Sequence, residues 1–172
     1  ELVAADGREG HGLVRGEDAV VRDDGQHGHR AGFLHEGVEA DLVQVQTATR
    51  VQFLQSGKVD LLIASMELNP DRAETLGYAP TPFYRVGGTA AVRKDSGIAK
   101  WEDLRGKTVC VSQGSSFAKP LANDYGAQVQ GFKSSAESLL ALKGGTCVAA
   151  VHDSTLIHPL LRSTPEWTQY SA

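Results

Sequence analysis

Residues 54–63 read LQSGKVDLLI, and residues 142–151 read LKGGTCVAAV. Both stretches follow one plan, in which the end of a helix is followed by a glycine turn and then by an apolar run of strand length. Glycine is common just past the end of a helix, and a near-continuous apolar run is typical of a strand that is covered on both faces. The two stretches therefore predict the same local structure in each half of the chain.

Polar side chains follow each apolar run directly. They are Ser65 and Glu67 in the first half and His152 and Asp153 in the second. In open α/β sheets, ligands bind at the carboxyl ends of the strands. Two such ends, one in each half, predict a binding cleft between two lobes.

From Ala40 onward, the sequence alternates between expected strands and expected helices, which predicts an α/β architecture with mainly parallel sheets. The apolar runs predict strands at 41–45, 59–64, 87–92, 108–111, 128–132 and 147–151. Helix signals mark 50–56, Asn69 with Pro70, the segment after Ser116, and 134–143, where Ser134 and Glu137 form a capping box.

Residues 1–37 have a different composition, rich in Gly, Asp, Arg and His, and their apolar residues follow no sustained period. Composition alone favours loop or disorder for this part. Two histidines in it, His27 and His29, lack further ligands at zinc-like spacing, so we interpret them as part of a solvated stretch and expect no metal and no cofactor.

The overall composition excludes several classes of protein. The net charge is −4, so the chain offers no basic surface for nucleic acid. No apolar run approaches the roughly 18 residues that span a bilayer. Two cysteines, Cys110 and Cys147, do not form a disulfide framework. Both sit in expected strands, and they are either two buried small residues or a bonded pair, if the strands are neighbours in an oxidising compartment.

The ordered set of motifs resembles the polar amino-acid-binding family of periplasmic solute-binding proteins of ABC transporters. The resemblance runs from about Ala40 to Tyr170 and rests on LQSGKVDLLIASMELNPDR at 54–72, TPFYRVGGTAAVRKDSGI at 81–98, WEDLRGKTVCVSQGSS at 101–116 and SAESLLALKGGTCVAAVHDS at 135–154. It implies a two-lobed type II periplasmic-binding-protein fold. It also implies reversible capture of a polar amino acid, delivery to a membrane permease, and no enzymatic activity.

In the first lobe, the resemblance assigns Arg72 to the ligand α-carboxylate, which a guanidinium can hold with two parallel hydrogen bonds. It assigns Ser65 to the ligand ammonium. Relatives carry Ser or Thr where this chain has Glu67. A carboxylate there would repel the ligand α-carboxylate unless its side chain turns away or pairs with Arg72. The alternative for Arg72 is a solvated residue in the first turn of a helix.

In the second lobe, the resemblance assigns Gly114 and Ser116 to the ligand carboxylate. We expect the serines after Gly114 to open a helix, whose N-terminal N–H groups favour an anion. Asp153 matches the family's acceptor for the α-ammonium. The structural alternatives are a plain serine N-cap and an aspartate that only caps the next helix.

Ligand specificity is expected to depend on Thr47 and Arg50, just ahead of the first helix. In dicarboxylate-binding relatives, Ser or Thr and Arg at these places hold a side-chain carboxylate, so an acidic or other polar amino acid is the first hypothesis. The alternative is that Arg50 is a surface residue at a helix start.

The expected domain boundary lies between Val92 and Arg93, which gives a first lobe of residues 1–92 and a second lobe of 93–172, with a hinge strand at 87–93. The family's usual first strand and first helix are not recognisable before Ala40, so we interpret the chain as a fragment with an incomplete first lobe and an atypical N-terminus. We expect a monomer, periplasmic or extracellular and either free or lipid-anchored, whose full-length precursor has a signal peptide.

Two functions from other classes remain open on the same scaffold. A cyclohexadienyl dehydratase-like enzyme would need a general acid or base in the cleft, and His152 beside Asp153 is the only local candidate. A ligand-sensing module of a membrane receptor would need a transmembrane segment elsewhere in its gene.

Overall fold

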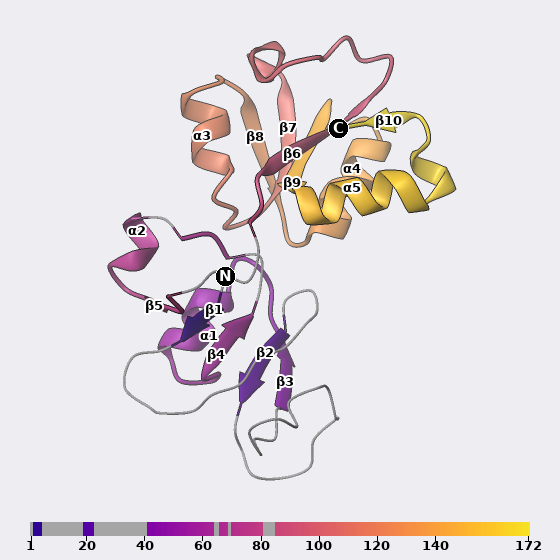
Figure 1. Cartoon of the computed structure of the whole chain (residues 1–172). Helices are drawn as coiled ribbons and strands as arrows, with labels where there is room; N and C mark the ends of the chain where they lie inside the picture. The colour runs from indigo at the N-terminus through magenta and orange to yellow at the C-terminus, as the bar shows by residue number, and fades with distance from the viewer. Residues whose placement is uncertain (1, 5–18, 23–40, 64–65, 69, 81–84) are drawn as a thin grey trace. The chain divides into compact units, whose positions relative to one another are not determined.

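The structure, a computed structural model, describes residues 2–4, 19–22, 41–63, 66–68, 70–80 and 85–172. The chain divides into two compact units, Glu1–Arg85 and Val86–Ala172. Each unit has its own five-stranded sheet and its own apolar core (Figure 1). No helix of the described residues is long and apolar enough to cross a membrane.

The second unit contains a mixed sheet with helices on both faces. Its strands are β6 (Gly88–Arg93), β7 (Thr108–Ser112), β8 (Gln128–Phe132), β9 (Ala149–Asp153) and β10 (Tyr170–Ser171), in the spatial order β10-β6-β9-β7-β8. β7 runs parallel to both β8 and β9, whereas β6 runs antiparallel to β9 and β10. Its helices are η1 (Trp101–Leu104), α3 (Ala118–Asn123), α4 (Ser135–Lys143), α5 (Ser154–Ser163) and η2 (Pro165–Trp167).

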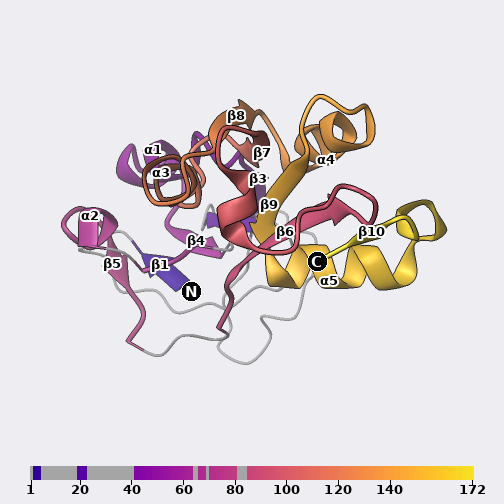
Figure 2. The same cartoon turned by 90° about the horizontal axis from the view of Figure 1, so that it is seen from above.

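Alternate residues of the central strands pack into two different cores, as the period of two in a strand requires. Cys110 and Ala150 contact α4 and α5 in one cluster. Their neighbours Val109, Val111 and Val151 belong to a second cluster with residues of η1 and α3. The sheet therefore lies between α4 and α5 on one face and η1 and α3 on the other. Figures 1 and 2 show α3, α4 and α5 beside this sheet from two directions.

The first unit contains β1 (Leu2–Ala4), β2 (Ala19–Arg22), β3 (Asp41–Gln44), β4 (Leu61–Ile63) and β5 (Gly77–Tyr78), in the order β3-β2-β4-β1-β5. Helices α1 (Arg50–Gln55) and α2 (Pro70–Ala73) precede and follow β4 in the chain. Every strand pair described in this sheet is antiparallel. The expectation of a mainly parallel sheet is therefore wrong for this unit.

The source of that error is the N-terminal stretch. Leu2–Ala4 and Ala19–Arg22 form β1 and β2, which pair with the two edges of β4 and run antiparallel to it. Short apolar runs in a polar stretch predict loop, but pairing with a buried strand makes them part of a sheet. The remainder of the predicted atypical stretch 1–37, including His27 and His29, lies outside the described residues.

The repeated plan of the two decisive stretches is confirmed. Helix α1 ends with Lys58 N–H donating to Phe53 O and Gly57 N–H donating to Leu54 O, the hydrogen-bond pair of a Schellman motif. Helix α4 ends in the same way, with Thr146 bonded to Ala141 and Gly145 to Leu142. Gly57 and Gly145 have φ of 67° and 77°, in the left-handed region that glycine adopts readily.

Two predicted boundaries change. The strand at 88–93 is paired on both sides within the second sheet, by β9 and β10, so the compact units divide before it at Arg85 and not after it. The helix expected to open at Ser116 begins at Ala118 instead, with Phe117 at its N-cap. Asn69, the predicted N-cap of α2, lies outside the described residues, and α2 begins at Pro70 as expected.

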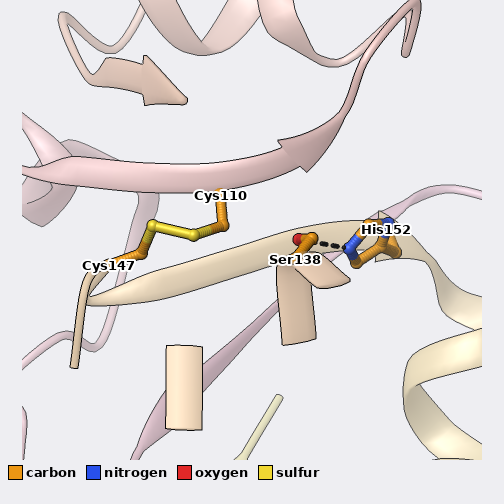
Figure 3. Close-up of a disulfide and its surroundings, with 4 residues drawn as sticks. All are labelled: Cys110, Ser138, Cys147 and His152. Atoms are coloured by element: carbon orange, nitrogen blue, oxygen red, sulfur yellow. Dashed lines mark hydrogen bonds between the residues drawn. A yellow bond between two sulfur atoms is a disulfide. The ribbon is translucent and has the colours of Figure 1, made fainter. Parts of the chain in front are cut away.

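The two cysteines form a disulfide, which settles the alternative that the sequence left open. Cys110 lies in the middle of β7, and Cys147 lies in the turn ahead of the neighbouring strand β9, with 5.8 Å between their Cα atoms. Both side chains are buried in the core that the sheet shares with α4 and α5 (Figure 3). The bond therefore crosses the centre of the second unit.

Candidate functional site

The second unit brings three of the predicted site residues to one edge of its sheet. β7 and β9 run parallel, so their carboxyl ends lie at the same edge. Gly114 and Ser116 follow β7 directly, and Asp153 is the last residue of β9. This edge corresponds to the place where parallel α/β sheets bind ligands.

The segment between β7 and α3, residues 113–117, is here called the serine loop. Its first residue, Gln113, donates its N–H to Phe132 O of β8 at 2.7 Å. Within the loop, Ser115 N–H donates to Ser112 O at 3.1 Å, and the Ser115 hydroxyl accepts from Phe117 N–H at 3.3 Å. The loop therefore has a defined shape, set by its own hydrogen bonds and by β8.

Ser115 makes a local capping-type contact. Its hydroxyl accepts a backbone N–H, as serine does at turns ahead of helices. Because α3 starts at Ala118, the predicted plain N-cap role for Ser116 is wrong.

Asp153 stands at the N-cap position of α5 and is partly buried, but its side chain makes no capping hydrogen bond. Its Cα pairs with Gly88 of β6, and the following N–H, from Ser154, donates to Gly87 O at 3.0 Å. A side-chain capping bond to α5 therefore does not account for the aspartate.

In the first unit, the structure brings together Arg72 and Glu67. Nη1 of Arg72 donates to the backbone carbonyl of Glu67 at 3.3 Å, and the Tyr78 hydroxyl donates to the same carbonyl at 3.2 Å. Arg72 is half-buried in this arrangement. These two bonds tie the segment after β4 to α2 and β5, and they fix where the guanidinium lies.

Thr47 and Arg50 lie in and just after the turn that opens α1. Arg50 N–H donates to Gln46 O at 3.0 Å, and its side chain is only 5% exposed. The alternative of a surface arginine is therefore wrong. A buried guanidinium needs compensating polar or charged groups, which is the property expected of a residue that lines a binding site.

Ser65, the predicted partner of the ligand ammonium, lies outside the described residues. The sequence did not single out Tyr78 or Phe117, although both contact predicted site segments. The available signal for each was an aromatic residue close to a turn. This pattern is too common in proteins to distinguish a site residue from one that only packs in the core. Within the described chain, no group of three or more His, Cys, Asp and Glu side chains is arranged to hold a metal ion.

His152, the candidate acid or base of the enzyme alternative, is a core residue. Its Nε2 lies 2.8 Å from the Ser138 hydroxyl, and both side chains are buried (Figure 3). Burial away from water disfavours the charged imidazolium and lowers the His152 pKa to about 4. The side chain is therefore neutral at physiological pH and faces the α4 side of the sheet, which does not suit proton transfer in an open cleft.

The chain is similar to several characterised proteins. It is 28% identical to the glutamine-binding protein of Geobacillus stearothermophilus over 78% of this chain and 52% of that protein. Two solved structures share its fold, holo ArgBP from T. maritima (27% identity, TM-score 0.71, 78% and 59% of the two chains) and the cysteine-binding protein from Campylobacter jejuni (30%, 0.68, 75% and 51%). The chain spans about half the length of the curated relatives it matches.

These similarities confirm the type II periplasmic-binding-protein fold that the motifs predicted. The relatives are named as binding proteins. The model of one protein family, bacterial extracellular solute-binding proteins, family 3, matches residues 30–166, which is most of the chain and includes parts of both units. The chain belongs to the bacterial extracellular solute-binding proteins, family 3.

Proposed function

We propose that this chain is part of the solute-binding component of an ABC importer and that it binds a polar amino acid reversibly between two lobes. Family membership supports this proposal, as do the relatives, which are named for binding glutamine, arginine and glutamate or aspartate. The observation that carries it is the position of Ser116, shortly after the end of β7, and of Asp153, the last residue of β9, because β7 and β9 are parallel neighbours whose carboxyl ends lie at one edge of the sheet.

The proposed site recognises both ends of a zwitterion. Arg72 binds the α-carboxylate from the first lobe through two parallel hydrogen bonds. Gly114 and Ser116 bind the same carboxylate from the second lobe. Asp153 accepts the α-ammonium, together with Ser65. Because the ligand joins charges on both lobes, its binding favours hinge closure.

The ligand side chain is proposed to lie against Thr47 and Arg50. The burial of Arg50 supports this assignment, because a shielded guanidinium binds a carboxylate more strongly than an exposed one does. An acidic amino acid is therefore the first candidate, with other polar amino acids next.

The proposed partners are an amino acid and a membrane permease, with no nucleic acid. The protein is proposed to act as a monomer outside the cytoplasmic membrane, either free or lipid-anchored. The Cys110–Cys147 disulfide supports an oxidising compartment. The burial of His152 supports a binding protein rather than an enzyme, because it shields from solvent the histidine that the enzyme alternative needs.

The test is a thermal-shift and calorimetry screen of the chain against the twenty common amino acids. A ligand at 100 times its Kd stabilises the protein by about 2.7 kcal/mol, which raises the Tm by roughly 5–10 °C for a protein of this size. L-Glutamate and L-aspartate are expected to give the largest shifts. No shift with any amino acid would contradict the proposal.

Two variants test the polar contacts. Asp153→Asn and Arg72→Lys are each expected to weaken binding by roughly 10–100-fold, the loss expected for a hydrogen bond to a charged group. Asp124→Asn and Arg162→Lys, at exposed positions of the second unit, provide matched controls that keep wild-type affinity. Equal affinity of Asp153→Asn and Asp124→Asn would show that Asp153 does not hold the ligand.

A further inference from the structure

The serine loop ends on a contact that its own hydrogen bonds do not explain. The ring of Phe117 lies against the backbone of Gly88, at the start of β6. A Cβ atom at Gly88 would lie 3.0 Å from Cε1 and 3.1 Å from Cδ1 of this ring. The ring therefore occupies the space that any other residue at position 88 would fill with its side chain.

On the side away from Gly88, the ring of Phe117 packs against the core of the second unit. Phe117 is half-buried and packs against the cluster that includes Val109, Val111 and Leu121. Protein interiors are closely packed, so a displaced ring must push against its neighbours. Phe117 is thus held between this core and the backbone of β6.

Gly88 connects this contact to the second polar group of the site. Its Cα is the direct cross-strand partner of Asp153 in the ladder between β6 and β9. Residues opposite each other in such a ladder have Cβ positions about 4.5–5.5 Å apart. The Phe117 ring therefore lies over Gly88, directly beside Asp153 on the neighbouring strand. The backbone of Phe117 belongs to the serine loop, which also carries Ser116.

We propose that Phe117, seated on Gly88, is a positioning residue that fixes the distance between the serine loop and Asp153. The inference rests on the proposed function for its consequence, because the loop and Asp153 are the two second-lobe contacts to the ligand. The contact between the Phe117 ring and Gly88, here called the seat, is a property of the ligand-free fold. It can be tested whether or not an amino acid binds.

The main variant is Gly88→Ala, examined by backbone amide NMR of the ligand-free chain. The added methyl group is expected to displace the Phe117 ring and to shift the amide signals of residues 114–117. The matched control is the adjacent Gly87→Ala, where an added Cβ meets nothing within 4 Å. Its effect on the signals of residues 114–117 is expected to be small.

The double variant Gly88→Ala/Phe117→Leu provides the rescue. Leucine is smaller than the phenyl ring, so it relieves the clash and is expected to return the signals of residues 114–116 toward their wild-type positions. If alanine at position 88 shifted these amide signals without acting through the Phe117 ring, the shifts would persist in the double variant. Persistent shifts, or unchanged loop signals in Gly88→Ala, would overturn the inference.

Phe117→Leu alone covers the case in which Gly88→Ala does not fold. Loss of the seat is expected to speed hydrogen–deuterium exchange in residues 114–118 at least threefold, with exchange in β8 unchanged. Unchanged exchange in residues 114–118 would contradict the proposal that the Phe117 ring holds the serine loop in place.

Calorimetry with L-glutamate then tests the consequence. Gly88→Ala is expected to weaken binding about tenfold, and the double variant is expected to recover most of that loss. If the wild type binds no amino acid, the proposed function fails and the NMR result still decides the seat. If the wild type binds and Gly88→Ala binds equally well with a shifted loop, the seat does not position the site.

Discussion

The turns that precede β4 and β9 are nearly the same, but the strands themselves are paired differently. Each strand follows a Schellman motif with a left-handed glycine. β9 then runs between β7 and β6, parallel to one and antiparallel to the other, with helices on both faces and a disulfide beside it. β4 runs between β1 and β2, antiparallel to both.

The difference shows which level of structure a local motif controls. Glycine and the apolar run determine where the helix ends and where the strand begins, because these depend on backbone conformation and burial within about ten residues. The direction of pairing depends on where the partner strands come from in the chain. β7 reaches the sheet before a crossover helix, whereas β1 and β2 come from the N-terminal stretch.

The largest expected difference between the units comes from the Cys110–Cys147 bond. It closes a loop of 37 residues in the second unit. By loop entropy, its removal is expected to lower the free energy of unfolding by about 4 kcal/mol. Both tryptophans, Trp101 and Trp167, lie in the second unit. Urea unfolding followed by tryptophan fluorescence therefore measures this unit, with and without dithiothreitol.

The control for this experiment is Cys110→Ala/Cys147→Ala, in which dithiothreitol is expected to have no effect. Amide exchange in β4 of the first unit should also be unchanged by reduction. A tryptophan transition that moves by less than 1 kcal/mol would show that packing, and not the bond, holds the second sheet together.

The titration of His152 is expected to lower the free energy of unfolding of the second unit by a smaller amount. Its pKa is about 4 in the folded protein and about 6.5 in the unfolded chain. Between these values the unfolded chain binds a proton that the folded protein does not, so stability falls as the pH is lowered from 6.5 and the loss is complete near pH 4. The loss amounts to about 3 kcal/mol.

The comparison variant for this prediction is His152→Gln, which removes the titration and keeps a polar group near the Ser138 hydroxyl. Tryptophan-monitored unfolding of both proteins between pH 7 and pH 4 isolates the histidine, because the carboxylates titrate in both. Parallel pH profiles would mean that His152 takes up its proton in the folded state as readily as in the unfolded chain.

Most of the strands and helices from Asp41 onward could be predicted because their signals are local, but the helix α5 and the short strands β5 and β10 were not predicted. The capping box is an example: Ser134 accepts from Glu137 N–H as predicted, although the Glu137 carboxylate accepts from Lys133 N–H and not from Ser134. The strands β1 and β2 could not be predicted, because three or four apolar residues in a polar stretch become a strand only through pairing with β4.

Some features of the candidate site could likewise be predicted from the sequence, and others could not. The sheet-edge position of Ser116 and Asp153 follows from their place after buried strands, so the sequence could predict it. The sequence singles out Arg50 by its resemblance to dicarboxylate-binding relatives, but its burial depends on contacts that the local sequence does not show. The contact between Phe117 and Gly88 joins segments far apart in the chain, and nothing in the sequence around these two residues distinguishes them from ordinary packing residues.

The two Schellman glycines offer a direct test of independence between the units. Gly57→Ala and Gly145→Ala each place a side chain in the left-handed region, which costs about 1.5 kcal/mol, and an added Cβ meets no atom within 4 Å at either site. Only Gly145→Ala is expected to shift the tryptophan-monitored transition, and only Gly57→Ala to speed amide exchange in β4. An equal tryptophan shift in both variants would show that the units unfold together.

The smallest expected difference concerns the starts of the two helices that precede these glycines. Ser134 accepts a hydrogen bond from Glu137 N–H at 3.2 Å, whereas Thr49 at the N-cap of α1 makes no capping bond and donates instead to Gln46 O. Ser134→Ala is therefore expected to destabilise its unit by about 1 kcal/mol.

Thr49→Ala is expected to change the stability of the first unit by less than about 0.5 kcal/mol, measured by amide exchange in β4. Ser134→Asn should restore most of the lost stability, because asparagine also accepts from a backbone N–H at the N-cap. If Ser134→Ala and Thr49→Ala have equal effects, the two helices depend on tertiary packing alone. The resemblance between the two halves would then be limited to the glycine turns and the strands that follow them.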